Sequence, residues 1–140
     1  MQFLDVSRQA VQAHFASQTL SQQSLETPLG LLARKHPASV GPQAPLSEAL
    51  SLMHDRRIGS VVVTDQDGGA LGILTRHDVL GRVTLPQLPL STPIERVMTA
   101  PLHTLTTTHT AHEAALLMSR HGIRHLPVTE EGRVVNMLPR

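Results

Sequence analysis

The amino-acid sequence predicts a mixed α/β (α+β) fold in which a β-α-β-β-α unit occurs twice in tandem, preceded by an N-terminal helix. Two observations predict it. Glu48 recurs as Glu113 and Met53 as Met118, so one segment of the chain is repeated 65 positions later. In both copies, apolar residues at helical spacing are followed by short, largely apolar stretches typical of strands. A repeated unit of this size closes its core against its twin, and a ligand would bind in the seam between the copies.

The composition narrows the class of protein. The 140 residues are enough for one domain or for two small ones that share a core. The 12 Lys and Arg residues nearly balance the 11 Asp and Glu residues, and the only aromatic side chains are Phe3 and Phe15. With no strongly basic surface and few rings for base stacking, no nucleic-acid partner is expected. The absence of cysteine excludes disulfides and fits a cytoplasmic location. No apolar run approaches the roughly 20 residues of a membrane helix, so no membrane partner is expected.

Residues 1–27 are predicted to form an N-terminal helical linker. Val11 and Phe15 lie one helical turn apart in a region rich in Gln, Ser and Ala. Because this apolar stripe is thin, the helix is expected to pack on the repeats or on a partner chain. Pro28 then begins a short helical turn, and a short extended segment is expected at 38–40 between prolines and a glycine.

The first repeat is predicted over residues 28–89. Ser47 is a favourable N-cap, and the apolar spacing after it predicts a helix that begins at Glu48. A run of valines predicts a strand covered on both faces, and the Asp and Gly residues after it predict a tight turn into a second strand. The expected elements are a helix over 48–56, strands over 60–64 and 70–74, and a closing helix from Thr75 or Arg76 to about 83.

The second repeat is predicted over residues 90–140, after a proline-rich linker at 85–93. It repeats the element order of the first copy but is C-terminally incomplete, so its closing helix is missing. Asn136 takes the place of a glycine and Pro139 the place of a hydroxyl residue. At most one high-affinity ligand per chain is therefore expected. The expected elements are a short helix ending at 98, an extended segment at 104–105, a helix capped near Thr110, and strands over 124–129 and 133–137.

Three motifs carry a resemblance to a known family. The first copy ends in Gly72-Ile73-Leu74-Thr75-Arg76-His77-Asp78, Val97-Met98-Thr99 precedes the second copy, and the second copy contains Gly122-Ile123-Arg124-His125-Leu126-Pro127-Val128. With these motifs and this element order, the chain resembles the cystathionine-β-synthase (CBS) domain over roughly 31–137. Two copies resemble the paired unit called a Bateman module. Since related modules associate through their repeat helices, the resemblance implies a homodimer.

A narrower resemblance rests on the segments around the first copy. Pro28-Leu29-Gly30 before it, and Leu85-Pro86 with Leu88 after it, are similar to the CBS region of bacterial signalling proteins. In those proteins a cyclic-nucleotide-binding domain precedes the pair and a nucleotidyltransferase-like domain follows it. The resemblance implies signal transduction with such flanking domains as partners. Either the chain is a fragment of a longer protein or its second copy is degenerate.

The end of the first copy carries the main candidate ligand-binding residues. Gly72 would let the backbone approach a ligand, Thr75 would offer a hydroxyl at a helix start, and Asp78 could accept two hydrogen bonds from a ribose. The resemblance implies that Thr75 holds the phosphate and Asp78 the ribose of an adenosine nucleotide such as AMP, ADP or ATP. The alternative is that Thr75 only caps the helix and Asp78 lies in its first turn.

Basic residues of the second copy are the next candidates. Arg124 and His125 occupy the positions of Gly59 and Ser60, and the resemblance implies that they reach across the seam toward phosphates. The alternative is plain surface charge at a strand end. The complete set of candidate binding residues is Ser39, Val40, Ile58, Gly59, Gly72, Thr75, Arg76, Asp78, Arg124 and His125.

Nine histidines raise the question of a metal site, particularly the pairs His109 with His112 and His121 with His125. Neither pair is predicted to share one helical face, and no cysteine completes a ligand set, so no metal site is expected.

The predicted function is regulation without catalysis. Outside the Thr75 and Asp78 pair, the sequence offers no nucleophile with a matched acid and base, so an enzyme is not expected and no cofactor is required. The module is expected to bind an adenosine nucleotide between its repeats and to relay occupancy to neighbouring domains or partners. Two alternatives remain: a dimerisation scaffold without a ligand, and part of a nucleotidyltransferase-like signalling enzyme whose catalytic domain lies outside this sequence.

Overall fold

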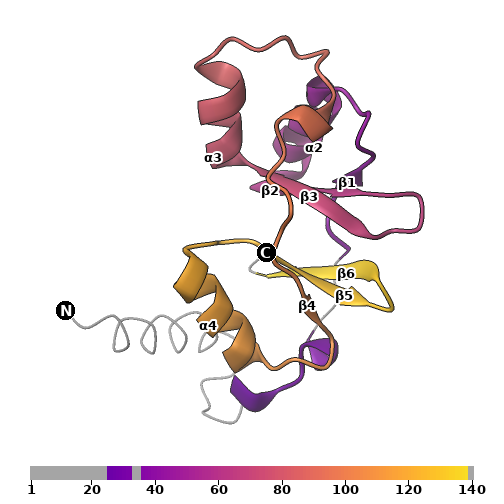
Figure 1. Cartoon of the computed structure of the whole chain (residues 1–140), viewed down its shortest axis with the longest axis vertical. Coiled ribbons are helices and arrows are strands. Elements are labelled where there is room, and N and C mark those ends of the chain that lie inside the picture. Colours follow the sequence, from indigo (N-terminus) through magenta and orange to yellow (C-terminus); the bar gives the residue numbers. More distant parts are fainter. Residues whose placement is uncertain (1–24, 33–35, 139–140) are drawn as a thin grey trace, which may run out of the picture.

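Two three-stranded sheets, each with helices beside it, make up the molecule (Figure 1). The structure, a computed structural model, describes residues 25–32 and 36–138, so the predicted N-terminal helix lies outside the described residues. The expected α+β fold with a repeated unit is confirmed. No helix in the described part of the chain is long and apolar enough to cross a membrane.

The two repeats follow the same element order, and each has a short helix before it. The first contains β1 (Ser39–Val40), α2 (Leu46–Arg56), β2 (Ser60–Thr64), β3 (Ala70–Thr75), α3 (Arg76–Val79) and the π-helical turn η3 (Leu80–Thr84). The second contains β4 (Leu105–Thr106), α4 (Ala111–His121), β5 (Leu126–Glu130) and β6 (Arg133–Leu138). The 3-10 helices η2 (Leu29–Leu31) and η4 (Ile94–Arg96) precede the first and second repeats respectively.

Strand pairing is the same in both sheets. β1 runs parallel to β2 and β3 antiparallel to it, and β4, β5 and β6 repeat this arrangement. The register shifts at the equivalent point of each hairpin, after Val63 in the first repeat and after Val128 in the second. Because a slip of one residue would turn every side chain to the opposite face, this agreement makes residue-by-residue comparison of the repeats possible.

The start of α2 differs from the sequence prediction. The helix begins at Leu46, with Pro45 in the N-cap position, and no side chain caps it. Ser47 lies inside the first turn, so it is not the cap. The backbone N–H groups of Leu46 and Ser47 donate to carbonyl groups of the linker between the repeats, at Thr92 and Leu90. These backbone partners satisfy donors that a capping side chain usually satisfies.

Each repeat is completed by a segment that precedes the other repeat in the sequence. Leu25 and Leu29 are buried in the core around α4 and β5, and the Leu29 N–H donates to the His109 carbonyl at 2.7 Å. Ile94 and Val97 are buried in the core around α2 and β2. The segments that precede the repeats therefore pack across from one repeat to the other, in addition to the contact between the sheets.

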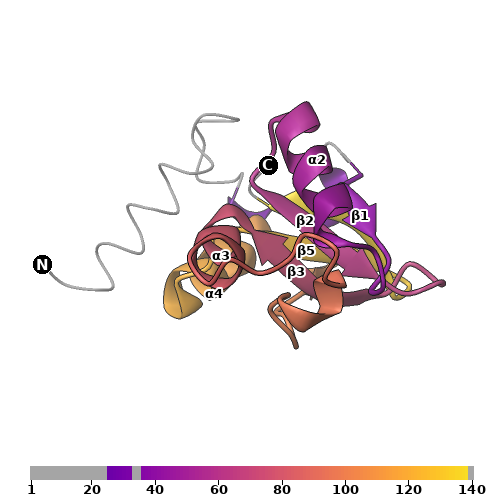
Figure 2. The ribbon, with the colours of Figure 1, turned by 90° about the horizontal axis from the view of Figure 1, so that it is seen from above.

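The sheets also meet directly. Val62 and Ile73 of the first sheet cluster with Met137 of the second in a small buried core. Ile73 and Thr99 exchange two backbone hydrogen bonds, of 3.1 and 2.8 Å. In both views α3 and α4 lie on the same side of the molecule (Figures 1 and 2), and Figure 1 shows α3 above α4. The start of α3 and the end of α4 consequently lie near the seam.

Candidate functional site at the seam between the repeats

A cavity of about 700 Å³ lies at the seam and takes its walls from both repeats. This volume is within the usual range for small-molecule sites. The first repeat supplies the start of β2 and the junction between β3 and α3, and the second supplies the loop between α4 and β5. Its lining residues are Gly59, Ile73, Thr75, Arg76, His77, Asp78, Thr99, Gly122, Ile123, Arg124 and His125.

Thr75 and Asp78 form a capping box at the start of α3. The Thr75 hydroxyl oxygen accepts from the Asp78 N–H at 3.2 Å, and the Thr75 N–H donates to Asp78 Oδ2 at 3.1 Å. Thr75 therefore caps α3, as the alternative interpretation expected. Both side chains also line the seam cavity.

The Asp78 carboxylate is held in place by further partners. The Thr99 hydroxyl donates to Oδ2 at 3.4 Å, and Arg82 Nη2 lies 3.7 Å from Oδ1. Arg82 is itself positioned by donating to the Val97 carbonyl at 2.8 Å. Within the described residues, Oδ1 has only the ion pair with Arg82, and a carboxylate oxygen can accept further hydrogen bonds. Asp78 is thus a fixed acceptor at the cavity wall.

Basic side chains from both repeats lie close to Gly59. A Cβ placed on Gly59 would lie 3.1 Å from Arg76 Nη2 and 3.4 Å from His125 Cε1, so the absence of a side chain leaves room for both. The Arg76 N–H donates to the Gly59 carbonyl at 3.0 Å. Arg124 and His125 lie before β5 and not on the strand as predicted, because the pairing with β6 begins at Leu126.

Gly72 needs to be a glycine for a reason other than the predicted one. A Cβ on this residue would lie 2.5 Å from the Met98 sulfur and 2.9 Å from the Thr99 carbonyl oxygen. The close approach at Gly72 is therefore made by the segment that leads into the second repeat, and not by a ligand. Gly72 does not line the seam cavity.

Three other candidate residues also lie away from the seam cavity. Ser39 is exposed on the short strand β1, and Val40 is buried in the core of the first repeat. Ile58 lines a separate pocket between α2 and α3, called here the α2–α3 pocket, and Arg76 lines both spaces. The structure therefore brings six of the candidates together: Gly59, Thr75, Arg76, Asp78, Arg124 and His125.

Five cavity residues were not predicted. Thr99 follows the Val97-Met98 motif directly, and Ile123 occupies the position in the second copy that Ile58 has in the first, so both carried a signal in the sequence. The other three lie inside the motifs at the end of the first copy and before β5, but they were not selected as binding residues. The additional lining residues are Ile73, His77, Thr99, Gly122 and Ile123.

The histidine pairs that raised the question of a metal are used in other contacts. The His121 ring stacks on that of His103, with ring centres 4.1 Å apart. His109 Nδ1 accepts from the Thr106 N–H at 3.0 Å. Across residues 25–32 and 36–138, no three His, Asp or Glu side chains gather where they could hold a metal ion.

Asn136 occupies the place in the second repeat that Gly72 has in the first. Gly72 pairs with Val63, and Asn136 pairs with the equivalent Val128. The Asn136 side chain is 2% exposed, and its Oδ1 accepts from the Met137 N–H at 2.9 Å. The second repeat therefore has no glycine at the position where Gly72 packs closely against Met98.

Two repeats that line one cavity define a tandem architecture, and comparison with known proteins identifies its family. The chain matches the family described as CBS domain over residues 30–84 and 94–140. It therefore belongs to this family, and its two repeats are a CBS pair, or Bateman module.

Individual relatives agree with this assignment. The chain is 32% identical over 101 residues to the CBS domain-containing protein YhcV of Bacillus subtilis, covering 72% of this chain and 71% of YhcV. It is 40% identical over 95 residues to CBSCBSPB5 of Arabidopsis thaliana, covering 66% of this chain but only 17% of the plant protein. Among solved structures it is similar to the CBS domain protein PAE2072 from Pyrobaculum aerophilum complexed with AMP. That match has a TM-score of 0.72 and 28% identity, and covers 79% of this chain and 86% of the other.

Proposed function

We propose that this chain is a regulatory module that binds an adenosine nucleotide in the seam cavity and relays its occupancy to neighbouring domains or partner proteins. The observation that carries the proposal is the distribution of charge around the cavity. A fixed carboxylate, Asp78, lies on one wall, and Arg76, Arg124 and His125 supply basic groups from both repeats. A nucleotide presents a ribose diol and an anionic phosphate group, which match these two features.

Each part of the nucleotide has a candidate partner. Asp78 Oδ1 can accept from a ribose hydroxyl, and Arg76 and Arg124 can bind phosphate oxygens. Ile73 and Ile123 offer apolar surface for the base. The AMP complex of PAE2072 supports the choice of ligand. The same residues support a role in binding without catalysis, because their described contacts hold side chains in place for a ligand.

Arg76 offers a route for relaying occupancy. Its side chain lines both the seam cavity and the outward-facing α2–α3 pocket. A phosphate that draws the guanidinium toward the seam would change the surface between α2 and α3. Such coupling requires that the nucleotide bind the two arrangements with different affinity.

Nucleotide-dependent thermal stability tests the proposal. A nucleotide at about 100 times its dissociation constant stabilises the native state by about 2.7 kcal/mol, so AMP, ADP or ATP should raise the melting temperature. Thr75→Ala combined with Asp78→Ala should abolish that rise. The matched control is Thr110→Ala combined with Glu113→Ala, which removes the equivalent capping box of α4 away from the cavity.

The control separates ligand binding from helix capping. Both double variants lose a capping box, so both should have a lower melting temperature without nucleotide. Only the variant at the seam should lose the response to nucleotide. An equal response in both would show that Thr75 and Asp78 only cap α3. No response in the unaltered protein would favour the scaffold without a ligand.

The proposal also includes the setting of the module. We expect a cytoplasmic homodimer in a bacterial signalling protein, with cyclic-nucleotide-binding and nucleotidyltransferase-like domains as candidate neighbours. The two similar repeats offer similar helical surfaces, which favours a two-fold assembly. Light scattering at micromolar concentration should give the mass of a dimer, and a monomer would contradict this part of the proposal.

A further inference from the structure

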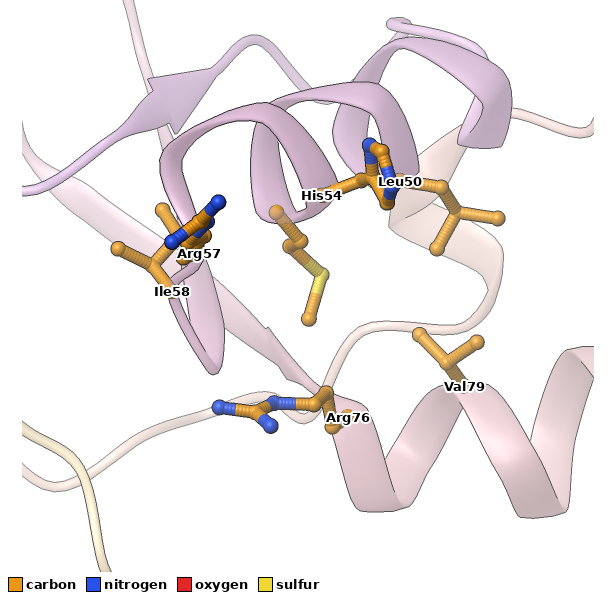
Figure 3. Close-up of a pocket in the computed structure, with 7 residues that line it drawn as sticks. Leu50, His54, Arg57, Ile58, Arg76 and Val79 are labelled. Carbon is orange, nitrogen blue, oxygen red and sulfur yellow. The ribbon is translucent and has the colours of Figure 1, made fainter.

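The two arginines of the helical segment that closes the first repeat have different surroundings. Figure 3 shows the Arg76 side chain in the space between α2 and α3, and the same side chain also lines the seam cavity. Arg82, on the π-helical turn η3, is directed toward Asp78 and toward the segment that leads into the second repeat. Arg82 does not line the seam cavity. Any effect of Arg82 on a bound nucleotide therefore passes through another residue.

Arg82 fixes the direction of the Thr99 hydroxyl. Arg82 Nη1 donates to the Val97 carbonyl at 2.8 Å and to Thr99 Oγ1 at 3.1 Å. A hydroxyl group has a single hydrogen, and an arginine can only donate. Because Thr99 Oγ1 accepts from Arg82, its own hydrogen is left to donate elsewhere, and Asp78 Oδ2 lies 3.4 Å away. The contact from Arg82 therefore makes Thr99 a donor to the carboxylate.

The Asp78 carboxylate consequently has one oxygen occupied and one oxygen presented. Oδ2 accepts from the Thr75 N–H at 3.1 Å and from the Thr99 hydroxyl at 3.4 Å. Oδ1 has the longer contact of 3.7 Å with Arg82 Nη2. Since the Asp78 side chain is only 12% exposed, loss of these partners would leave a largely buried charge poorly satisfied. The arrangement keeps Oδ1 able to accept from a ribose hydroxyl.

Helix capping does not explain these extra partners of Asp78. In the capping box of α4, every hydrogen bond that the Glu113 carboxylate accepts within the described residues comes from Thr110. A box of this kind thus forms without an arginine. At Asp78 the same motif has Arg82 and Thr99 in addition, and Arg82 lies in a π-helical turn, a rare geometry that often occurs at functional sites. These features indicate a use of Asp78 beyond capping.

We propose that Arg82 is a positioning residue of the seam site and sets its preference for ribose over deoxyribose. Through Thr99, and by its own contact with Oδ1, Arg82 holds the Asp78 carboxylate in the orientation that accepts hydrogen bonds from a ribose diol. The site therefore distinguishes ribonucleotides from 2′-deoxyribonucleotides, although Arg82 itself does not touch the ligand. This inference rests on the proposed function, because it concerns the part of the nucleotide that Asp78 binds.

Calorimetry with AMP, ATP and their 2′-deoxy forms measures this preference. The unaltered protein should bind each ribonucleotide about tenfold more tightly than its deoxy form, because the deoxy form lacks a hydrogen bond to a charged group. In Arg82→Met, which keeps an aliphatic side chain, the affinity for the ribonucleotides should fall about tenfold while that for the deoxy forms changes little. A purely structural role would weaken both forms by the same factor, and that result would overturn the proposal.

Three further variants separate positioning from charge and from folding. Arg96→Met removes a positive charge from η4, away from the cavity, and should leave the preference unchanged. Arg82→Lys keeps the charge but lacks the planar fork that reaches both Thr99 and Asp78, so it should also lose the preference. Thr99→Val removes the intermediate hydroxyl and should have the same effect. Because Arg82→Met and Thr99→Val break one pathway, the double variant should lose little more, and full additivity would contradict the route through Thr99.

The outcomes distinguish this inference from the proposed function. If the unaltered protein binds neither AMP nor ATP, the proposed function is wrong and the role of Arg82 falls with it. If the nucleotides bind without a preference for ribose, only the role of Arg82 is wrong. The same conclusion holds if folded Arg82→Met or Arg82→Lys, checked by its melting temperature, keeps the preference of the unaltered protein.

Discussion

Gly72 was selected from the sequence as a ligand-binding residue, but the structure shows a packing reason for a glycine at this position. The sequence motif suggested that its missing side chain makes room for a ligand. In the structure that room is taken by Met98 and by the Thr99 carbonyl. The glycine therefore joins the first repeat to the segment that leads into the second, and its contribution is to stability.

Replacement of Gly72 by alanine should destabilise the protein without weakening ligand binding. The new methyl group would overlap Met98, and such overpacking typically costs about 1–3 kcal/mol. Urea unfolding measures this loss, and calorimetry should show nucleotide affinity close to that of the unaltered protein. Gly81→Ala is the control, since a Cβ there would meet no atom within 4 Å and should stabilise the helical turn slightly. Equal stability of the two variants would contradict the packing interpretation.

At the scale of elements, three helix starts are built in two ways. α3 and α4 each begin with a complete capping box, formed by Thr75 with Asp78 and by Thr110 with Glu113. The cap near Thr110 was predicted because a threonine followed three residues later by a glutamate is a local signal. The predicted cap at Ser47 was wrong. Carbonyl groups of the linker, distant in sequence, accept hydrogen bonds from the backbone N–H groups at the start of α2.

The capping box of α4 should make stability depend on pH in the acid range. The hydrogen bond from the Thr110 backbone N–H holds the pKa of Glu113 below its usual range. Desolvation opposes this shift, and the Thr110 hydroxyl, His109 and His112 add to it. Since the pKa is lower in the folded state, the stabilisation is present above the unfolded pKa. It is lost as the pH falls through the folded pKa.

Thermal melts of the Glu113→Gln variant between neutral and acid pH measure the contribution of this carboxylate to stability. The difference in melting temperature from the unaltered protein should be largest near neutral pH and should shrink as the pH falls. Glu48→Gln, in the first turn of α2, removes the same charge without breaking a capping bond and controls for net charge. A difference for Glu113→Gln that stays constant with pH would contradict the role of its carboxylate.

At the scale of the whole molecule, the two repeats are alike in fold and unlike in chemistry. Their sheets share one register, including the shift after Val63 and Val128. The seam cavity nevertheless takes its capping box and its carboxylate from the first repeat alone. The second repeat contributes Arg124 and His125, so both repeats line the one cavity.

This asymmetry predicts one tightly bound nucleotide per chain. In the second repeat, buried Asn136 replaces Gly72, and Pro139 replaces Thr75 and lacks the backbone N–H that a phosphate site at a helix start would use. Titration calorimetry should therefore give a stoichiometry of one nucleotide per chain. The Asp78→Asn variant should lower the affinity without creating a second class of site. Two equivalent tight sites per chain would contradict the prediction.

The sequence alone determined the repeat, the order of its elements and most of the residues around the seam. These depend on local signals: the period of apolar residues, the chemistry of turns, and motifs that place Thr75 and Asp78 at a helix start. Only the tertiary structure showed that Gly72 packs against Met98, that Arg76 lines two separate spaces, and that each core is completed by a segment from before the other repeat. Such contacts join residues far apart in the chain, and no local pattern encodes which distant groups will meet once the repeats pack together.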